Sequence, residues 1–372
     1  MNVPLLDIKL QNEMLRPEIE AAIGRVLDSN AFILGEEVAA LERELAEYCG
    51  TDFAIGCASG SDALLLALMA HDVGPGDEVI TTPYSFFASV SAITRLGARP
   101  VFVDIDPETY NLDVESVRAK ISTFTKAVQP VHLFGQCVEM QALLEICDEA
   151  GVPILEDAAQ AIGSEDNGRR AGSMGSIGCF SFYPSKNLGG MGDGGFLTTN
   201  DKRLADKLFA LRVHGSPERY FHKWVGLNSR LDGFQGAVLR VKLPYLDGWT
   251  VRRQENAKRY RELINDSGLS EYIGLPAERS GKRHIYNQFV VRISKRRDEL
   301  RAFLSESGVG TDIYYPVPLH LQECFAFLGY REGDLPEAER ASRETLALPV
   351  FPEMRNDQQD HVVAKLKEFF ER

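Results

Sequence analysis

The order of apolar and polar positions along the chain predicts an α/β protein. Short apolar runs, which indicate buried strands, alternate with longer segments in which apolar residues recur every three or four positions, which indicates helices. The predicted strands are 52–58, 78–82, 100–103, 127–131, 153–156 and 178–182. The predicted helices are 13–28, 36–49, 59–68, one that begins at Ser85, 113–120 and 140–150. Strands that alternate with helices in this way form a mostly parallel sheet with right-handed crossovers.

The last third of the chain predicts a smaller C-terminal α/β domain. Its expected elements are one long helix, two strands and a closing helix, at 234–265, 285–293, 310–315 and 357–370. A chain of 372 residues with 44% hydrophobic content can bury two cores. We therefore expect a large domain at 1–245 and a small domain at 246–372.

A carboxylate ends one of the predicted strands. The segment Val152–Ala161 is an apolar run that reaches Glu156 and Asp157 and continues in small residues. This places Asp157 at the C-terminal end of a buried strand, and in α/β sheets ligands bind at that edge. The alternative role of Asp157, taken alone, is to cap the helix that follows.

A lysine follows the next predicted strand in unusual surroundings. Lys186 lies among aromatic residues and glycines, between Phe180–Pro184 and the glycine-rich stretch Gly189–Gly195. Burial lowers the pKa of a lysine, and a neutral amine is what a Schiff base requires. The alternative is a lysine that extends from a loop into solvent. Lys186 and Asp157 together favour a pyridoxal phosphate (PLP) site, because PLP needs an amine for its aldehyde and a carboxylate for its ring nitrogen.

The segment Ser59–Leu68 offers a place for a phosphate group. Small residues open an apolar helix there, so its first N–H groups point outward from the positive end of the helix dipole. Gly60, Ser61 and Asp62 form this first turn, and the Ser61 hydroxyl adds a donor. Ordinary capping by Ser59 or Ser61 is an equally good interpretation of the residues alone.

Charge and cysteine content narrow the class of protein. A net charge of −13 argues against partners such as nucleic acid or an anionic membrane surface. The chain has no stretch of transmembrane length and no signal-peptide pattern at its N-terminus. Its six cysteines include no CxxC pair, and we expect reduced thiols in a cytoplasmic protein. No cluster of His, Cys and Asp has the spacing of a metal site, so no metal is expected.

These segments resemble the DegT/DnrJ/EryC1/StrS family of PLP-dependent nucleotide-sugar aminotransferases. The resemblance extends from Pro4–Asp7 to Leu348–Pro352, and Gly226–Asp232 is its most specific piece besides the Asp157 and Lys186 segments. It implies PLP fold type I, with a mostly parallel seven-stranded sheet in the large domain. Some relatives carry histidine at the lysine position and dehydrate sugars, whereas this chain keeps Lys186.

The resemblance also implies roles for individual residues. Lys186 would form the Schiff base and carry the proton, Asp157 would hold the ring nitrogen protonated, and Gln160 would bond the ring hydroxyl. Phe86 would lie against the ring face. The phosphate would be bound by the first turn of the helix at 59–68 together with Ser181 and Asn228, the last from the partner subunit.

On the substrate side the resemblance implies contacts from several parts of the chain and from a second subunit. The candidate residues are Phe32, Tyr183, Arg230, Tyr315 and His320. Asn228 and Arg230 match positions that one subunit supplies to its partner's site, so a homodimer with composite active sites is expected. The partners of the enzyme are then a nucleotide sugar and L-glutamate.

The expected reaction transfers the amino group of L-glutamate to a nucleotide-linked keto-sugar. The segment from His214 to Asp232 is more similar to the branch that aminates C3 of a dTDP- or UDP-3-keto-hexose. Amination at C4 of a nucleotide-4-keto-6-deoxy sugar is the alternative within the enzymes, and both nucleotides stay open. The alternative of another class is a non-catalytic regulatory protein with the PLP fold, against which the intact Lys186, Asp157 and Gln160 argue.

Overall fold

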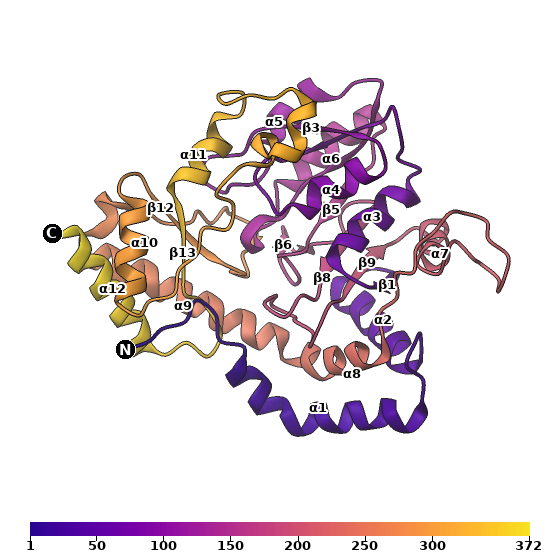
Figure 1. Cartoon of the computed structure of the whole chain (residues 1–372), viewed down its shortest axis with the longest axis horizontal. Coiled ribbons are helices and arrows are strands. Elements are labelled where there is room, and N and C mark those ends of the chain that lie inside the picture. Colours follow the sequence, from indigo (N-terminus) through magenta and orange to yellow (C-terminus); the bar gives the residue numbers. More distant parts are fainter.

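The computed structural model describes residues 1–372 and is built around a central β-sheet (Figure 1). One part of the sheet has the order β1-β9-β8-β5 and the other the order β3-β2-β4, and two parallel bridges, Val128–Ile154 and Val131–Asp157, join β4 to β5. Only β9 is antiparallel to its neighbours. The strands are β1 (Phe53–Cys57), β2 (Glu78–Thr81), β3 (Arg99–Phe102), β4 (Thr125–Gln129), β5 (Leu155–Asp157), β8 (Ile177–Ser181) and β9 (Gly195–Thr199). The predicted mostly parallel sheet is confirmed.

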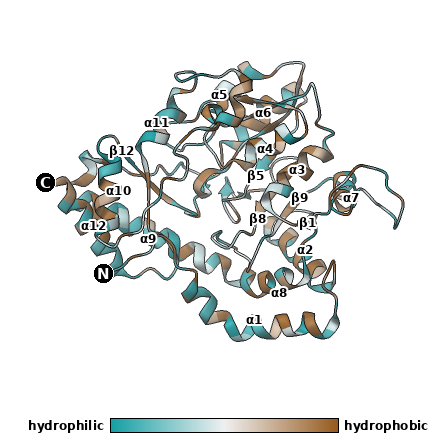
Figure 2. Ribbon diagram, in the orientation of Figure 1, coloured by the Kyte–Doolittle hydropathy of each residue, from teal (hydrophilic) through white to brown (hydrophobic).

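Helices cover both faces of this sheet, as expected for buried parallel strands. One hydrophobic cluster joins the sheet to α2 (Glu36–Cys49), α6 (Met140–Ala150) and α8 (Gly233–Lys242). A second cluster joins the other face to α3 (Gly60–Ala70), α4 (Ala88–Arg95) and α7 (Lys202–Leu211). Helix α1 (Lys9–Ser29) packs on α8 at the edge of the molecule, and Figure 2 shows hydrophilic residues along much of it.

The C-terminal part forms its own core around a three-stranded antiparallel sheet. The order is β10-β12-β13. The elements of this part are α9 (Leu246–Asp266), β10 (Ile273–Gly274), β12 (Phe289–Ile293), α10 (Arg297–Glu306), α11 (Pro336–Glu344), β13 (Thr345–Leu348) and α12 (Asn356–Phe370). The cluster of 22 buried residues at its centre also includes Val3, so the N-terminal residues pack here, and Figure 1 shows both termini at this end. The division at residues 245 and 246 stays a prediction.

Several predicted elements are wrong in detail. The helix expected at 234–265 is interrupted between α8 and α9 by a 3₁₀ turn, Leu243–Tyr245, where Pro244 lacks the N–H that a continuous helix needs. Residues 310–315 make only one bridge, Asp312–Ala347, because Gly310 and Pro316 limit the segment. The strand expected at 285–293 begins at Phe289. The helix expected at 113–120 is a single turn, α5 (Val114–Val117), followed by the 3₁₀ turn Arg118–Lys120.

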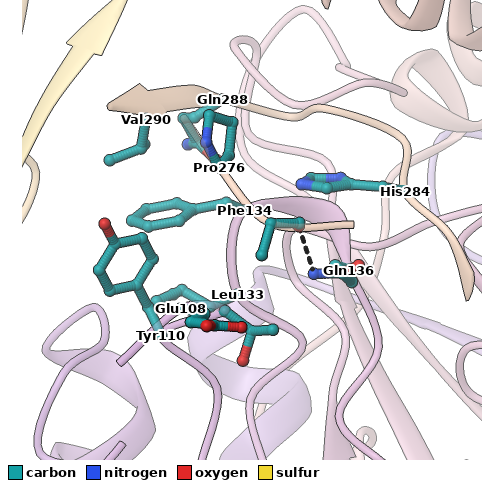
Figure 3. Close-up of a pocket in the computed structure, with 11 residues that line it drawn as sticks. Glu108, Tyr110, Leu133, Phe134, Gln136, Pro276, His284, Gln288 and Val290 are labelled. Atoms are coloured by element: carbon teal, nitrogen blue, oxygen red, sulfur yellow. Dashed lines mark hydrogen bonds between the residues drawn. The ribbon is translucent and has the colours of Figure 1, made fainter. Parts of the chain in front are cut away.

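A small sheet connects the two parts of the chain. Strand β11 (Lys282–Arg283) pairs with β6 (Glu165–Asp166), which pairs with β7 (Arg169–Arg170). The Lys282 ammonium lies 2.9 Å from Asp166 Oδ1, and both side chains are almost fully buried. Beside this sheet, residues from the segments 108–136 and 276–290 line a pocket of about 10 Å³, the lower limit for one water molecule (Figure 3). None of the helices is both long enough and apolar enough to cross a lipid bilayer.

Candidate active site

The candidate residues gather at one edge of the central sheet. Asp157 is the last residue of β5 and Ser181 the last residue of β8, and these two strands are parallel. Helix α3 starts just after β1 and helix α4 follows β2, so both begin at the same edge. The predicted location at the carboxyl ends of the strands therefore matches the arrangement of these elements.

Asp157 is a buried carboxylate with one hydrogen bond to each oxygen. The Ser89 hydroxyl donates to Oδ2 at 2.7 Å, and the Ala159 N–H donates to Oδ1 at 3.2 Å. Ser89 in turn lies 2.9 Å from the Ser85 hydroxyl. Burial raises the pKa of Asp157, and the hydrogen bond from Ser89 opposes this rise. A cation placed against this carboxyl group would favour its charged form.

The residue before Asp157 anchors the strand from behind. Glu156 is fully buried and accepts backbone N–H groups of Gly172, Met174 and Gly175 at 2.5–2.8 Å. The His132 Nε2 lies 2.9 Å from Glu156 Oε2, and His132 Nδ1 accepts the Val138 N–H, which assigns the proton of a neutral ring to Nε2. Although burial opposes it, the hydrogen bonds lower the pKa of Glu156. This network fixes the end of β5 that carries Asp157.

Lys186 lies in the loop between β8 and β9 and has a free amine. No hydrogen bond or ion pair involves its Nζ atom in this structure. Burial lowers the pKa of Lys186 to about 8, and the negative charge of Asp157 acts in the opposite direction. The loop itself is held at three points: Asn187 Nδ2 donates to Ile285 O, Lys242 Nζ donates to Gly189 O, and the Met191 N–H donates to Gln235 Oε1.

The first turn of α3 meets the ends of β8 and β9 without room for side chains. Ser59, not Ser61, caps the helix by accepting the Asp62 N–H at 3.1 Å. A Cβ added to Gly60 would lie 2.7 Å from Ser181 Cβ, and one added to Gly195 would lie 2.6 Å from the Ser59 carbonyl carbon. The Ser61 hydroxyl is exposed and makes no hydrogen bond within the chain. These features form a cradle of N–H and hydroxyl donors that suits a phosphate group.

Aromatic residues border the same edge. Phe86 follows β2, is 62% exposed and contacts no other ring, so its face is open to a flat ligand. Gln160 is engaged on both sides, because its Oε1 accepts the Phe134 N–H and its Nε2 donates to Tyr315 Oη, each at 2.8 Å. Tyr315 is only 6% exposed and stacks on Phe134. The structure thus brings Tyr315 to the site behind Gln160, rather than at its open surface.

The other predicted substrate contacts differ in how they are placed. His320 does not lie with the other candidate residues at the sheet edge. Its side chain is fully buried against Phe102, with Nε2 3.1 Å from Glu339. Tyr183, three residues before Lys186, is 55% exposed. Phe32 is 39% exposed and stacks on Phe234 of α8 at 5.6 Å. The predicted role of His320 gains no support from this geometry.

Asn228 and Arg230 lie on either side of a residue that is bonded to the end of β1. Between them, the buried Ser229 accepts the Ala58 N–H at 3.2 Å and so fixes the segment beside β1. Neither Asn228 nor Arg230 makes a side-chain hydrogen bond or ion pair. The loop just before them exposes apolar side chains, with Tyr220 at 77% and Val225 at 92%. These features suit a surface that meets another molecule.

The residues present fit PLP. The cradle at Gly60 and Ser181 suits its phosphate, the open Phe86 suits its ring, and the Asp157 carboxylate and the free Lys186 amine are the two groups that its chemistry needs. No group of three or more His, Cys, Asp or Glu side chains is arranged to hold a metal ion.

Three supporting residues were not found from the sequence. Ser89 bonds Asp157, and Gln235 and Lys242 hold the loop that carries Lys186. The one available signal was Lys242 itself, a lysine among the apolar positions of a predicted helix. Ser89 and Gln235 are ordinary polar residues whose partners lie 68 and 44 positions away.

The chain is similar to known proteins over nearly its whole length. The model of the DegT/DnrJ/EryC1/StrS aminotransferase family matches residues 13–367. The chain is 50% identical to the "Pleiotropic regulatory protein" of Geobacillus stearothermophilus, over 100% of this chain and 99% of that protein. It is 45% identical to the dTDP-3-amino-3,4,6-trideoxy-alpha-D-glucose transaminase of Streptomyces venezuelae, over 100% and 97% of the two chains. The crystal structure of S. venezuelae DesV with a ketimine intermediate superimposes with a TM-score of 0.96, at 44% identity and with 100% and 99% of the chains covered.

Proposed function

The chain belongs to the DegT/DnrJ/EryC1/StrS aminotransferase family, and we propose that it transfers the amino group of L-glutamate to C3 of a nucleotide-linked 3-keto-sugar. It is a PLP-dependent sugar aminotransferase with fold type I. The observation that carries the proposed roles of its residues is the pair formed by a half-buried Lys186 amine without a hydrogen-bond partner and a buried Asp157 carboxylate at one sheet edge.

PLP supplies an electron sink that stabilises negative charge on the carbon next to the transferred nitrogen. In this proposal Lys186 holds the cofactor through its amine, and Asp157 bonds the ring nitrogen and keeps it protonated. The cradle formed by Gly60, Ser61 and Ser181 receives the phosphate. Phe86 covers one face of the ring.

Lys186 also moves the proton in the reaction. The Lys186 amine would accept the proton from the donor's Cα and would then donate it on the cofactor side of the transferred nitrogen. A pKa near 8 suits this work, because both protonation states are accessible near neutral pH. Overall, glutamate becomes 2-oxoglutarate, and the C=O of the keto-sugar becomes CH–NH₂.

Gln160 is the predicted partner of the ring hydroxyl. Its amide already bonds Phe134 and Tyr315, so its orientation is fixed before the cofactor arrives. Its Oε1 accepts the Phe134 N–H, and one N–H of Nε2 donates to Tyr315. The second N–H of Nε2 is left to bond the ring oxygen. In this proposal Tyr315 orients Gln160 and does not contact the substrate directly, although the sequence predicted that contact.

We propose that the active enzyme is a homodimer with composite sites. The unpartnered Asn228 would bond the phosphate of the PLP held by the partner, and Arg230 would bind the substrate there. A chain of net charge −13 that binds a nucleotide diphosphate needs a local cation, and a guanidinium offers paired donors to phosphate oxygens.

The position of amination and the nucleotide are inferred from relatives. The transaminase of S. venezuelae, 45% identical, is named for a dTDP-3-amino sugar, and a relative from Acidithiobacillus ferrooxidans, 42% identical, is named for the 3-amination of a UDP sugar. Both names point to C3, which favours C3 over C4 for this chain. Both dTDP and UDP sugars are therefore candidate substrates.

The first test is spectroscopic. PLP held by Lys186 should give the protein an absorption in the visible range, which L-glutamate should bleach while one equivalent of 2-oxoglutarate appears per site. Lys186→Ala should lose the visible band and turnover, yet keep the circular dichroism of the folded chain. Substantial transamination by Lys186→Ala without added amine would refute the assignment.

The second test identifies the acceptor. A panel of dTDP- and UDP-linked 3-keto and 4-keto sugars, generated in place, is incubated with the enzyme and glutamate. Mass spectrometry detects the replacement of oxygen by NH₂, and NMR of the product places the nitrogen. A 3-amino product is expected, and a 4-amino product from a 4-keto-6-deoxy sugar would overturn the C3 proposal.

A regulatory role is the second candidate, because the 50% identical protein of G. stearothermophilus is named a pleiotropic regulatory protein. The two roles differ in the spectroscopic test. A non-catalytic binding protein would keep the visible band on addition of glutamate, while the proposed enzyme bleaches.

We also propose a cytoplasmic location. All six cysteines are free thiols, and five of them are buried. Structural disulfides mark proteins of oxidising compartments, so a chain with six unpaired cysteines suits a reducing one. Labelling of all six thiols after denaturation without a reductant would agree with this location.

A further inference from the structure

The loop that carries Lys186 rests on one helix through two side chains. Gln235, in the first turn of α8, accepts the Met191 N–H at 2.8 Å. Lys242, the last residue of the same helix, donates to Gly189 O at 2.9 Å. The loop therefore contacts both ends of helix α8. Lys186 lies three residues before Gly189, the residue that Lys242 bonds.

Lys242 is unusual among the lysines of the chain. Its side chain is 3% exposed, and it makes no ion pair with any carboxylate. Its one hydrogen bond is to Gly189 O, and burial lowers its pKa to about 8. Burying an amine without a counter-charge is unfavourable, and an apolar residue of similar length would fill the same space without that penalty. The contact with Gly189 is what this lysine provides and an apolar residue would not.

Gly189 is a fixed point of the loop. Its Cα lies so close to the Pro184 carbonyl that an added Cβ would collide with it, and its N-terminal neighbour Leu188 is fully buried. The segment from Pro184 to Gly189 is thus a tight turn that contains Lys186. Lys242 ties the base of this turn to α8.

We propose that Lys242 is a positioning residue: it holds the turn bearing Lys186 against α8 and so sets the position of the Lys186 amine in the candidate site. The inference rests on the proposed role of Lys186 as the residue that holds PLP. Loss of the Lys242 donor leaves Gly189 O without a partner in a buried place, so the turn has to open to water to satisfy it. The effect on the reaction then comes through Lys186 and not through direct contact with substrate.

The test compares Lys242→Met, which keeps the length and loses the donor, with Asn256→Leu. Asn256 is a matched control because it is 5% exposed and its Nδ2 donates to the Phe351 carbonyl at 2.8 Å, remote from this loop. In the full chain without PLP, hydrogen exchange of the amides of 186–192 should accelerate about tenfold in Lys242→Met, the size of one lost buried hydrogen bond. Asn256→Leu should leave these amides at wild-type rates.

A second measurement follows the PLP-loaded enzyme. The visible band of the lysine-bound cofactor changes with pH. The pH of this change should shift in Lys242→Met, because this substitution alters the position of Lys186. It should stay unchanged in Asn256→Leu. If Lys242→Met fails to fold, Lys242→Leu, which also lacks the donor, replaces it in both measurements.

The outcomes separate this inference from the assignment of Lys186. Wild-type exchange in 186–192 and an unshifted band in the Lys242 variant would overturn the role of Lys242, whatever Lys186→Ala does. Equal changes in the Asn256 control would do the same, since they would reflect general loosening. A visible band that survives Lys186→Ala would instead refute Lys186 while leaving the exchange result intact.

Discussion

Burial acts on two amines in this molecule, Lys186 and Lys242, and its consequence is a dependence of stability on pH. Both have a pKa of about 8 in the folded chain, against about 10.5 for an exposed lysine. Below pH 8 both are charged in the folded and unfolded states, and the folded state bears the cost of burying the charge. Between pH 8 and 10.5 the unfolded chain binds more protons, so the free energy of unfolding rises with pH.

This sign gives a prediction for Lys242→Met. The variant lacks the buried charge, so its free energy of unfolding should not share the rise that Lys242 gives the wild type between pH 8 and 10. We expect the variant to become progressively less stable relative to the wild type over this range, by at most about 3 kcal/mol. Urea unfolding of the PLP-free proteins at pH 7, 8, 9 and 10 measures the difference.

Burial alone lowers the pKa of Lys242, and no carboxylate contributes. A change of relative stability with pH in Lys242→Met can therefore be assigned to the buried charge. Lys202→Met is the control, because Lys202 is exposed and pairs with Asp206 on the surface of α7. Its stability relative to the wild type should stay constant between pH 8 and 10. A difference for Lys242→Met that is equally flat would show that this amine keeps an ordinary pKa.

Asp157→Asn tests the carboxylate at the same scale. The amide fills the same space and can keep the hydrogen bond from Ser89, and the phosphate cradle is untouched, so PLP should still bind. The amide cannot hold the ring nitrogen protonated, and turnover should fall by about a hundredfold or more. Titration with PLP followed by the visible band, and steady-state rates with saturating substrates, measure the two effects. A near-normal rate would mean that another residue protonates the ring.

Asp157 and Lys186 could be predicted from the sequence because each is a charged residue within an apolar or glycine-rich segment. Ser89 and Gln235 could not, because their partners lie 68 and 44 positions away and only the fold brings them together. Lys242 is a lysine among apolar positions, but its partner Gly189, 53 positions away, could not be predicted. His320 shows the opposite failure: a polar ring in a suggestive segment is in fact buried against Glu339.

At the scale of elements, periodicity predicted most of the strands of the central sheet but not β9. Gly195–Thr199 is buried at all five positions, yet it begins in a glycine-rich stretch whose glycines are needed for close packing and not for a turn alone. The break between α8 and α9 was also missed, although Pro244 marks it. Helical periodicity continues on both sides of this proline, so the pattern alone gives one helix.

The packing of α3 against β8 leads to a prediction for Gly60→Ala. The new methyl group would lie 2.7 Å from Ser181 Cβ, so the first turn of α3 has to move away from the end of β8. The donors of the phosphate cradle separate, and the dissociation constant for PLP should rise about tenfold, equivalent to one hydrogen bond to a charged group. Equilibrium dialysis or fluorescence titration measures it.

Gly74→Ala is the matched control for this change. A Cβ at Gly74 meets nothing within 4 Å, and the backbone there is not left-handed. PLP affinity of this variant should equal that of the wild type. If Gly60→Ala also binds PLP normally, the cradle at the start of α3 is not where the phosphate is held.

At the scale of the whole molecule, the surface carries groups that the single chain leaves without partners. Phe86 and Tyr183 are more than half exposed beside the site, and Tyr220 and Val225 extend from the loop before Asn228. A second copy of the chain that covers these residues would bury apolar area and bring a cation to the site. The sequence could not place this surface by composition, because one chain's pattern does not tell which residues face a partner; only the resemblance suggested it.

The last prediction tests whether Arg230 acts across the dimer. Lys186→Ala and Arg230→Ala should each be inactive alone. If Arg230 serves the partner's site, a mixed dimer has one site with Lys186 and Arg230 both intact and a second site with both defects. Random reassortment of equal amounts makes half of the dimers mixed, so about a quarter of wild-type activity is the maximum expected after mixing.

The measurement requires proof of exchange, because stable dimers that never dissociate would also stay inactive. Each variant carries a different affinity tag. Dimers bearing both tags are isolated by two successive affinity purifications before the assay. These doubly tagged dimers should show about half of the wild-type activity per dimer, since one site in two is complete. Inactive doubly tagged dimers would place Arg230 in the site of its own chain: there, one subunit lacks Lys186 and the other lacks Arg230, and no site is whole.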